Sequence, residues 1–308
     1  MPPAGLPFVA AVIVAAAACA GAFLARGTTA VPAAWWACGA AVAFAVESAA
    51  RARGGLVDPA AQASARLAVA ALALCPIMSL LGAKRPQHGV WQFIVASLAG
   101  ILALPAASAA LVRPGSQPDV HPLQQWFMLA LVLVGLMNFI ATRHGLAAGL
   151  VAAGQLMLLR RFLPFAAADG PSAPTADAMA AALVATGAAV AVVQSWGWPA
   201  GPRVDAGGAS RPAVRRAGVA DPAALDAAYL ALRETLGAAW TLRIAERFNA
   251  VAESRGWPCR LRFDGLHVEG DPDDRAWQAD AVRTGEALLR RFASPAWLRR
   301  HAGEGKNT

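Results

Sequence analysis

Long apolar runs separated by short polar segments dominate the chain up to Trp198. A run of about 18 or more apolar residues is long enough to cross a bilayer core as a helix. Seven candidate spans follow from this criterion: Pro7 to Ala25, Val31 to Ser48, Leu67 to Ala83, Trp91 to Val112, Gln125 to Thr142, Gly145 to Leu159 and Ala178 to Trp198. The sixth is short and ends at Arg160, so the pattern is compatible with seven spans or with six.

The charges beside these runs predict how the chain is oriented. The first run has no basic residue before it, and its only charge, Arg26, follows it, which favours a retained span with its N-terminus outside over a cleaved signal peptide. Seven spans then place eight basic residues on the cytoplasmic side against six on the other. We therefore expect a protein of the cell inner membrane with a cytoplasmic tail, whereas six spans would reverse the tail.

The pattern changes after Trp198. Residues 1–199 are expected to form a transmembrane helical domain, residues 200–220 a flexible Gly, Pro and Arg linker, and residues 221–308 a soluble α+β module. In the module, Asp221 and Pro222 have the form of a helix N-cap and first helical residue. A β-hairpin with its turn at Asp264-Gly265 and a second helix follow.

The helix that starts at Asp221 is predicted to run unbroken to Arg255 with one apolar stripe. Its spacing of three and four residues places the members of the stripe on one face. They include Tyr229, Leu232, Leu236, Trp240, Ile244 and Phe248. We expect this stripe to bind a protein partner or a second copy of the chain.

Composition and charge narrow the class of protein. Of the 308 residues, 57% are apolar and only 15% are charged, which excludes an ordinary soluble globule. The formal net charge of +8 comes from segments beside the spans, because residues 218–308 hold 13 basic and 13 acidic residues. The positive net charge therefore does not indicate a nucleic-acid-binding domain. The 4 cysteines are scattered and support neither a disulfide framework nor a zinc site.

Few residues within the spans could carry chemistry. Glu47 is ionisable but lies at the end of its span, one turn before Arg51, so the two are expected to form an ion pair at headgroup depth. Pro76 and Pro105 interrupt the third and fourth spans, as helix kinks or as the breaks that line a transport site. The soluble part has no motif of a nucleotide site, hydrolase or metalloprotease. The sequence thus predicts no catalytic, cofactor-binding or metal-binding residue.

A polar cluster at the membrane edge is the remaining candidate site. The stretch LGAKRPQHGVWQFIV contains Lys84, Arg85 and His88, and His144 would lie on the same side in the seven-span arrangement. The stretch is explained as a topology determinant, in which the basic pair ends the third span, His88-Gly89 turns the chain and Trp91 anchors the fourth. The alternative is a site for a lipid or quinone headgroup.

Two segments carry a resemblance to a known family: CPIMSLLGAKRPQHGVWQFIV and LGAAWTLRIAERFNAVAESRGWPCRLRFDGL. They resemble multi-span membrane proteins of planctomycete-type bacteria. The resemblance implies a bacterial membrane protein with a cytoplasmic tail. It implies no activity, cofactor or catalytic residue.

The sequence as a whole predicts a mainly α protein, a polytopic helical membrane bundle followed by a small cytoplasmic α+β module. The lipid bilayer is its expected surrounding, and no nucleic-acid partner is expected. The function it favours is that of a non-enzymatic accessory or scaffold protein. A permease or channel-like carrier that uses the proline-broken spans, and a membrane-embedded enzyme that acts on a lipid or quinone, are the alternatives.

Overall fold

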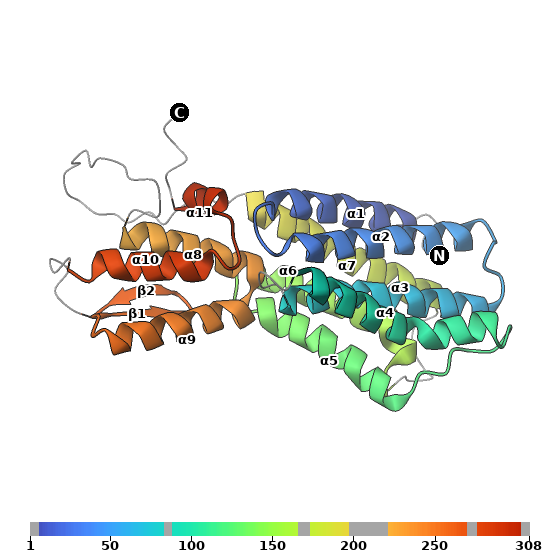
Figure 1. The fold of residues 1–308 in the computed structure, drawn as a ribbon. Coiled ribbons are helices and arrows are strands. Elements are labelled where there is room, and N and C mark those ends of the chain that lie inside the picture. The colour runs from blue at the N-terminus through green and yellow to red at the C-terminus, as the bar shows by residue number, and fades with distance from the viewer. Residues whose placement is uncertain (1–5, 83–87, 166–172, 197–220, 270–275, 303–308) are drawn as a thin grey trace. The chain divides into compact units, whose positions relative to one another are not determined.

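A computed structural model describes residues 6–82, 88–165, 173–196, 221–269 and 276–302 (Figure 1). The chain forms two compact units. The first contains the helices up to Trp196, and the second contains the C-terminal module together with Arg26–Thr29. The linker that we expected over residues 200–220 lies outside the described residues.

The first unit is a bundle of α-helices with one short 3-10 helix, η1. Its elements are α1 (Leu6–Leu24), α2 (Val31–Ala52), α3 (Pro59–Leu81), α4 (His88–Leu111), α5 (Pro122–Phe139), α6 (Gly145–Leu159), η1 (Arg160–Phe162) and α7 (Ala173–Trp196). Within the described residues, 6 helices are long and apolar enough to cross a membrane, namely all of these α-helices except α6. The prediction of a bundle of helices long and apolar enough to cross a membrane is therefore confirmed. The predicted sixth span, α6, is too short to meet the length criterion.

Two helices, α3 and α7, start five or more residues earlier than the apolar runs predict. The Asp58 carboxylate accepts hydrogen bonds from the backbone N–H groups of Ala60 and Ala61, both at 3.1 Å, and Pro59 occupies the first turn. An N-cap followed by proline is a strong helix start, so α3 begins at Pro59 and not at Leu67. Likewise α7 begins at Ala173, ahead of the expected Ala178. Both extensions bring charged residues into helices.

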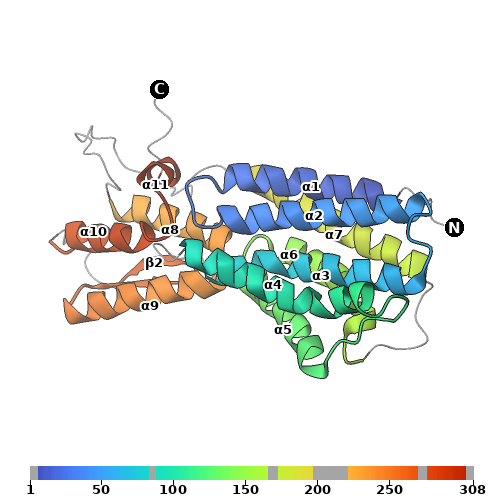
Figure 2. The same cartoon turned by 45° about the vertical axis from the view of Figure 1, so that its right-hand side comes forward.

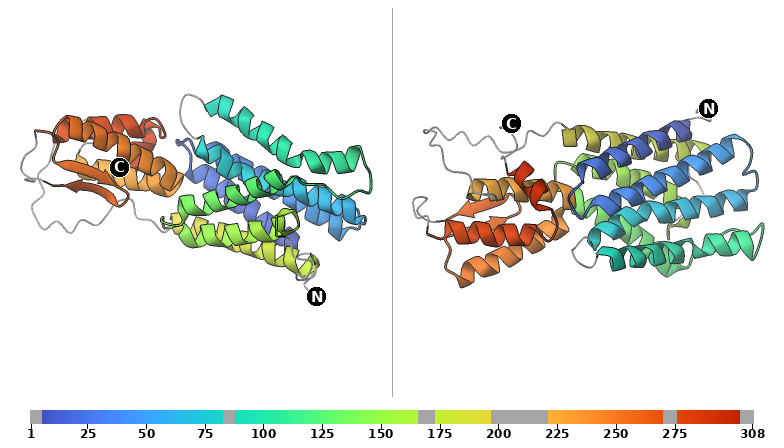
Figure 3. Two further views of the ribbon diagram at one scale, coloured as in Figure 1. Left: turned by 90° about the horizontal axis from the view of Figure 1, so that it is seen from below. Right: turned by 45° about the horizontal axis from the view of Figure 1, so that its top comes forward.

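Helix α3 lies at the centre of the bundle, where it contacts α2, α4, α5 and α6. The main apolar core gathers around its buried side chains, among them Leu67, Leu74 and Met78. Helix α1 runs beside α2 and α7 (Figures 1 and 2). Helix α4 packs on α3 at the outer edge of the bundle (Figure 3). It begins at His88, so the expected turn at His88-Gly89 is instead the first turn of a helix.

Close approach between α6 and α7 depends on two glycines. A Cβ atom on Gly154 would lie 2.5 Å from the Val184 Cγ2 atom and 2.9 Å from the Ala180 carbonyl oxygen. A Cβ atom on Gly187 would lie 2.9 Å from the Ala147 carbonyl oxygen. Small residues at such contacts let helix backbones pack tightly where both helices are apolar. The short helix α6 is therefore held firmly against α7.

The C-terminal module contains four helices and one hairpin. Its elements are α8 (Pro222–Leu236), α9 (Ala238–Ser254), β1 (Cys259–Arg262), β2 (Gly265–Val268), α10 (Gln278–Leu289) and α11 (Pro295–His301). The long helix predicted from Asp221 to Arg255 is wrong. It breaks at Gly237, whose φ of 78° and ψ of −171° belong to a region that residues with a Cβ atom avoid.

The predicted interaction stripe forms the interior of the module. Tyr229, Leu232, Leu236, Ile244 and Phe248 are each at most 3% exposed, and the half-buried Trp240 packs its ring 5.0 Å from that of Phe292. These side chains are covered by the module itself. The stripe is thus a core, and the expectation that it binds a partner is corrected. A stripe that wide is equally typical of a core, and the break at Gly237 folds its two halves together.

Polar side chains hold the hairpin on the helices. The Asn249 amide donates to the Leu261 carbonyl at 2.9 Å and accepts from the Leu261 N–H at 2.7 Å. The Asp226 carboxylate accepts from the Leu266 N–H at 2.7 Å. Because Arg262 pairs with Gly265, the turn lies one residue earlier than predicted.

Residues Arg26–Thr29 belong to this second unit. The Thr29 N–H donates to the Phe292 carbonyl at 2.8 Å, and the Ser294 N–H donates to the Gly27 carbonyl at 2.6 Å. Thr28 and Ala293 form an isolated antiparallel bridge between these two bonds. The fold of the unit therefore includes a segment distant in sequence.

Candidate functional site

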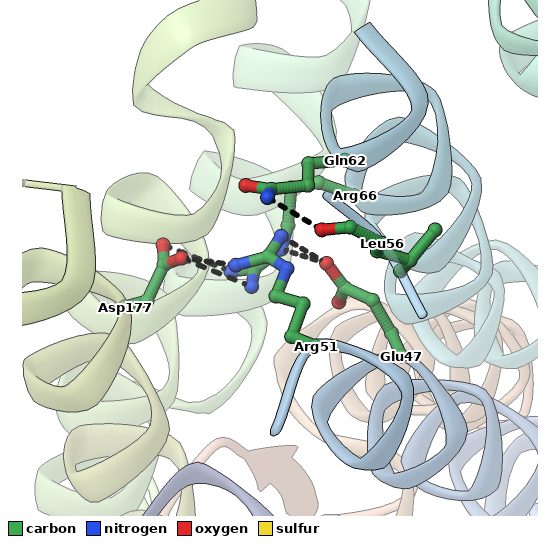
Figure 4. Close-up of polar contacts among 6 residues, drawn as sticks. All are labelled: Glu47, Arg51, Leu56, Gln62, Arg66 and Asp177. Carbon is green, nitrogen blue, oxygen red and sulfur yellow. Dashed lines mark hydrogen bonds and ion pairs between the residues drawn. The ribbon is translucent and has the colours of Figure 1, made fainter. Parts of the chain in front are cut away.

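Four charged side chains meet inside the bundle at the end where α2 stops and α3 begins (Figure 4). Glu47 and Arg51 come from the last turns of α2, Arg66 comes from the first half of α3, and Asp177 comes from the first turns of α7. We call these four residues the charge cluster. It connects the consecutive helices α2 and α3 with α7, which is distant from them in sequence.

Each guanidinium of the charge cluster contacts both carboxylates. Arg66 lies 2.9 Å from the Glu47 carboxylate through Nε, and 3.1 Å and 3.2 Å from the two Asp177 oxygens through its terminal nitrogens. Arg51 bonds the same Glu47 oxygen and lies 2.5 Å from Asp177. Two positive and two negative charges thus cancel. The paired contacts of Arg66 with Asp177 have the parallel geometry typical of strong arginine–carboxylate pairs.

The charge cluster is largely removed from solvent. The side chains of Glu47 and Arg66 are 2% and 6% exposed, and those of Asp177 and Arg51 are 19% and 23% exposed. The Arg66 guanidinium also lies over the Phe44 ring, 5.5 Å from its centre. Burial on this scale makes the loss of one partner costly, because an unpaired charge would remain away from water.

The loop between α2 and α3 is tied beside the cluster. The Gln62 side chain donates to the Leu56 carbonyl at 2.7 Å, and Figure 4 shows this bond next to Arg66. Together with the Asp58 cap, it fixes the start of α3. The position of Arg66 therefore depends on two local signals, the cap and the glutamine, that precede it in the chain.

The sequence predicted only part of this arrangement. The ion pair of Glu47 with Arg51 is present, but Glu47 is buried and not solvated at headgroup depth. Arg66 and Asp177 were missed, since each lies just before the apolar run that marked its span. The Asp58-Pro59 start signal could have placed Arg66 inside a helix.

Polar contacts at both ends of α6 show that this helix traverses the bundle. At its start, His144 lies 3.3 Å from the Gln194 side-chain oxygen near the end of α7. At its other end, Arg160 is within electrostatic reach of Asp177 at the start of α7. Helix α6 with η1 spans about 28 Å at ordinary helix rises, close to the ~30 Å of a hydrocarbon core. The chain therefore passes along the bundle seven times in the described residues.

Glutamines close both proline breaks. Proline has no N–H for the carbonyl four residues earlier and also disturbs the bond to the next carbonyl. For Pro105 these carbonyls belong to Ile101 and Leu102, and Gln124 of α5 donates to them at 3.3 Å and 2.8 Å. For Pro76, Gln155 of α6 donates to the Ala73 carbonyl at 2.9 Å. A neighbouring helix thus supplies a donor to both of these carbonyls at Pro105 and to one of the two at Pro76.

The surroundings of Pro76 are apolar. Leu74, Cys75 and Met78 belong to the same core cluster as Leu102 and Ala106 of α4, and all five are at most 4% exposed. Close packing of buried apolar side chains is expected where a proline only bends a helix. A transport site at these breaks would instead present polar groups to a cavity.

The predicted membrane-edge polar cluster is only partly visible. Lys84 and Arg85 lie outside the described residues, as does the side chain of His88. His144 receives a hydrogen bond from Arg143 at its Nε2 atom, at 3.2 Å, and its Nδ1 atom faces Gln194. These contacts tie the His144 ring to its neighbour Arg143 and to Gln194 of α7. Trp91, the expected headgroup anchor, donates to the Met78 carbonyl at 2.8 Å and so joins α4 to α3.

An apolar groove of about 470 Å³ lies between α1 and α7. Small residues such as Ala10 and Ala185 form its buried floor, and Val9 and Ile13 form exposed walls. Gln194 lines it as well. An apolar chain is the kind of ligand that such a groove fits.

The module adds no obvious reactive centre. Within the described residues, no group of three or more His, Cys, Asp or Glu side chains could hold a metal ion. Cys259 is buried, and burial raises the pKa of its thiol to about 11. Such a thiol stays protonated at neutral pH and is a poor nucleophile.

Comparison with known proteins found no matching family model, no matching curated protein and no matching solved structure.

Proposed function

We propose that this chain is a multi-pass membrane protein that acts as a non-enzymatic accessory or scaffold and displays its C-terminal module in the cytoplasm. The charge cluster carries the proposal. Its four side chains neutralise one another across α2, α3 and α7. Ionisable groups inside a bundle ordinarily serve an ion or substrate pathway. Here they are engaged with each other and hold helices together, which supports a rigid frame over a carrier.

The glutamine contacts support the same proposal. Gln124 and Gln155 occupy the carbonyls that Pro105 and Pro76 leave open. The polar groups at the two breaks are thereby committed to the fold. The carrier alternative needs these groups to face a substrate, so it has less support.

The distribution of arginines supports a cytoplasmic module. Arg51 and Arg66 belong to helices and to the charge cluster. We therefore do not count them among the basic loop residues on the side of the α2–α3 loop. Four basic residues then remain on the side of the α2–α3 loop, against eight that the seven-span arrangement of the sequence assigns to the other side. The four are Arg53, Arg113, Arg160 and Arg161, and the eight are Arg26, Lys84, Arg85, Arg143, Arg203, Arg211, Arg215 and Arg216. This bias is larger than the eight against six of the sequence alone, and basic ends favour the cytoplasm.

The partner-binding surface must differ from the predicted stripe, because that stripe is a core. Large apolar residues that the module leaves exposed are Leu242 on α9 and Val268 on β2, at 54% and 44% exposure. The buried centre of a protein interface is enriched in apolar side chains, so these two positions are the ones at which we look for a partner. We expect a protein partner or a second copy of the chain to contact this surface.

Site-specific photocrosslinking in living cells tests the proposal. A photoreactive amino acid is placed at Leu242, at Val268 and, as the matched control, at the exposed Arg283 of α10. A scaffold predicts a discrete protein adduct from Leu242 or Val268 and none from Arg283. If none of the three positions yields a protein adduct, the scaffold function is wrong.

A second candidate function is action on a lipid or quinone, which the groove between α1 and α7 favours. Its polar lining residue Gln194 lies 3.3 Å from the His144 ring, so one side chain connects the apolar groove with a histidine. Extraction of the purified protein and chromatography of the organic phase test it. A stoichiometric prenyl or acyl compound that Ala189→Phe removes would support this function, and an empty extract would exclude it.

A further inference from the structure

Arg160 is a partly buried arginine, and one of its guanidinium nitrogens has no hydrogen-bond partner among the described residues. It is the first residue of η1, directly after α6. Its Nη1 atom is buried and has no hydrogen-bond partner among the described residues. Arginine stays charged in proteins, so the group needs an anion.

Three of the four oxygens of the neighbouring carboxylates already accept hydrogen bonds from Arg51 or Arg66. Both Asp177 oxygens accept from Arg66, and one of them also accepts from Arg51. Glu47 accepts from both arginines through one oxygen, and its other oxygen is buried without a donor. Since the charge cluster sums to zero, Arg160 adds one uncompensated positive charge at this end of the bundle. Its acceptor must come from outside the described chain.

The position of Arg160 suggests where that acceptor comes from. The exposed rings of Trp126 and Phe165 pack edge to face near this end, with centres 6.1 Å apart. Exposed aromatic residues of membrane proteins gather at the depth of the lipid headgroups. Arg161, the next residue after Arg160, is exposed. The end of η1 therefore lies where lipid phosphates are available.

We propose that Arg160 binds the phosphate of a membrane phospholipid, whose headgroup supplies the anion that the charge cluster lacks. A guanidinium presents paired N–H donors that match phosphate oxygens. Arg160 is the residue that turns inward and needs the phosphate, while the exposed Arg161 can remain in water. The inference rests on the chain lying in a membrane, and it does not depend on the scaffold function.

Lipid titration of the full-length protein in detergent tests the proposal. Binding is followed by native mass spectrometry with three probes: phosphatidylglycerol, diacylglycerol with the same acyl chains, and inorganic phosphate. The wild type and Arg161→Gln should retain phosphatidylglycerol, and Arg160→Gln should bind it at least about tenfold more weakly, as expected for charge-assisted hydrogen bonds. Diacylglycerol, which has no phosphate, should bind all three proteins equally weakly.

Competition by inorganic phosphate and a second Arg160 variant distinguish the possible results. Inorganic phosphate that competes with the lipid would show that the headgroup phosphate alone is recognised, and lipid binding without competition would show that the chains contribute as well. If Arg160→Gln unfolds, Arg160→Lys keeps the charge and should bind the lipid with intermediate strength. Equal phosphatidylglycerol binding by the wild type and the folded Arg160 variants would overturn the proposal. The photocrosslinking experiment is unaffected by either result, so the two proposals fail separately.

Discussion

Replacing Arg66 by methionine should lower the free energy of unfolding of the bundle by more than the replacement of an exposed arginine does. The side chain is 6% exposed, and its three nitrogens lie 2.9 Å, 3.1 Å and 3.2 Å from carboxylate oxygens of Glu47 and Asp177. Each charge-assisted bond contributes about 1.5 to 3 kcal/mol, but bonds within one cluster do not add. Removing one partner of a buried pair typically costs about 3 to 5 kcal/mol. We expect a loss in that range.

The physical reason is the charge that remains. Arg66→Met leaves two carboxylates and one guanidinium, a net charge of −1 away from water. The double variant Arg66→Met with Asp177→Asn keeps the ion pair of Arg51 with Glu47 and restores neutrality. It should therefore recover at least about 1 kcal/mol relative to Arg66→Met alone, an interaction energy ordinary for residues in one network.

Unfolding of the purified protein in mixed detergent, followed by circular dichroism against added dodecyl sulfate, measures these free energies. The control Arg53→Met changes an exposed arginine just beyond α2 and should shift stability by no more than about 0.5 kcal/mol. The reasoning is refuted if Arg66→Met behaves like Arg53→Met, or if the double variant loses as much as the two single variants added together.

Three further predictions concern packing, a proline break and a thiol. Gly82→Ala should cost about 1 to 3 kcal/mol in the same assay, because its Cβ atom would lie 2.0 Å from the Trp91 ring. Gln155→Leu should cost about 1 to 3 kcal/mol, because the carbonyl that it serves beside Pro76 loses its donor. In a variant whose other three cysteines are replaced, Cys259 should react with maleimide slowly at about pH 8. The reaction rate should rise about tenfold for each pH unit up to about 11, because burial raises the pKa of this thiol to about 11 and maleimide reacts with the thiolate.

Each of these predictions has a control or a contrary outcome. Gly100→Ala in α4 places its Cβ atom where nothing lies within 4 Å and should not destabilise the protein, which isolates the ring contact at Gly82. Pro76→Ala should reduce the cost of Gln155→Leu, and an unchanged cost would mean that the glutamine does not serve the proline break. A half-maximal labelling rate near pH 8.5 would show that Cys259 is not buried.

The apolar pattern was sufficient to place most of the helices but not their starts. It located α1, α2, α4 and α5 to within a few residues, since length and hydropathy decide those helices. It missed the early start of α3, because Asp58-Pro59 is a capping signal that hydropathy does not register. The same signal was recognised at Asp221-Pro222, where α8 does begin. Applying it throughout would have brought Arg66 into its helix.

The charge cluster could not have been assembled from the sequence alone. Its members are separated by up to 130 residues, the distance in sequence from Glu47 to Asp177. Only the three-dimensional packing of α7 beside α2 and α3 brings them together. The apolar stripe of the module differs from the charge cluster, because its residues were predicted but its role was not. Its spacing was read correctly, but a core and a binding face share that spacing, and the conformation of Gly237 decided between them.

The most direct test of the account is the sidedness of the two ends of the chain. In the proposed arrangement, seven passes with the arginine-rich end inside give an N-terminus outside and a module in the cytoplasm. An epitope at the N-terminus and a fluorescent protein at the C-terminus are probed in intact cells. We expect antibody to reach the N-terminal epitope without permeabilisation and the C-terminal fusion to fluoresce. Both ends on one side of the membrane would mean that α6 does not cross, and would contradict the account.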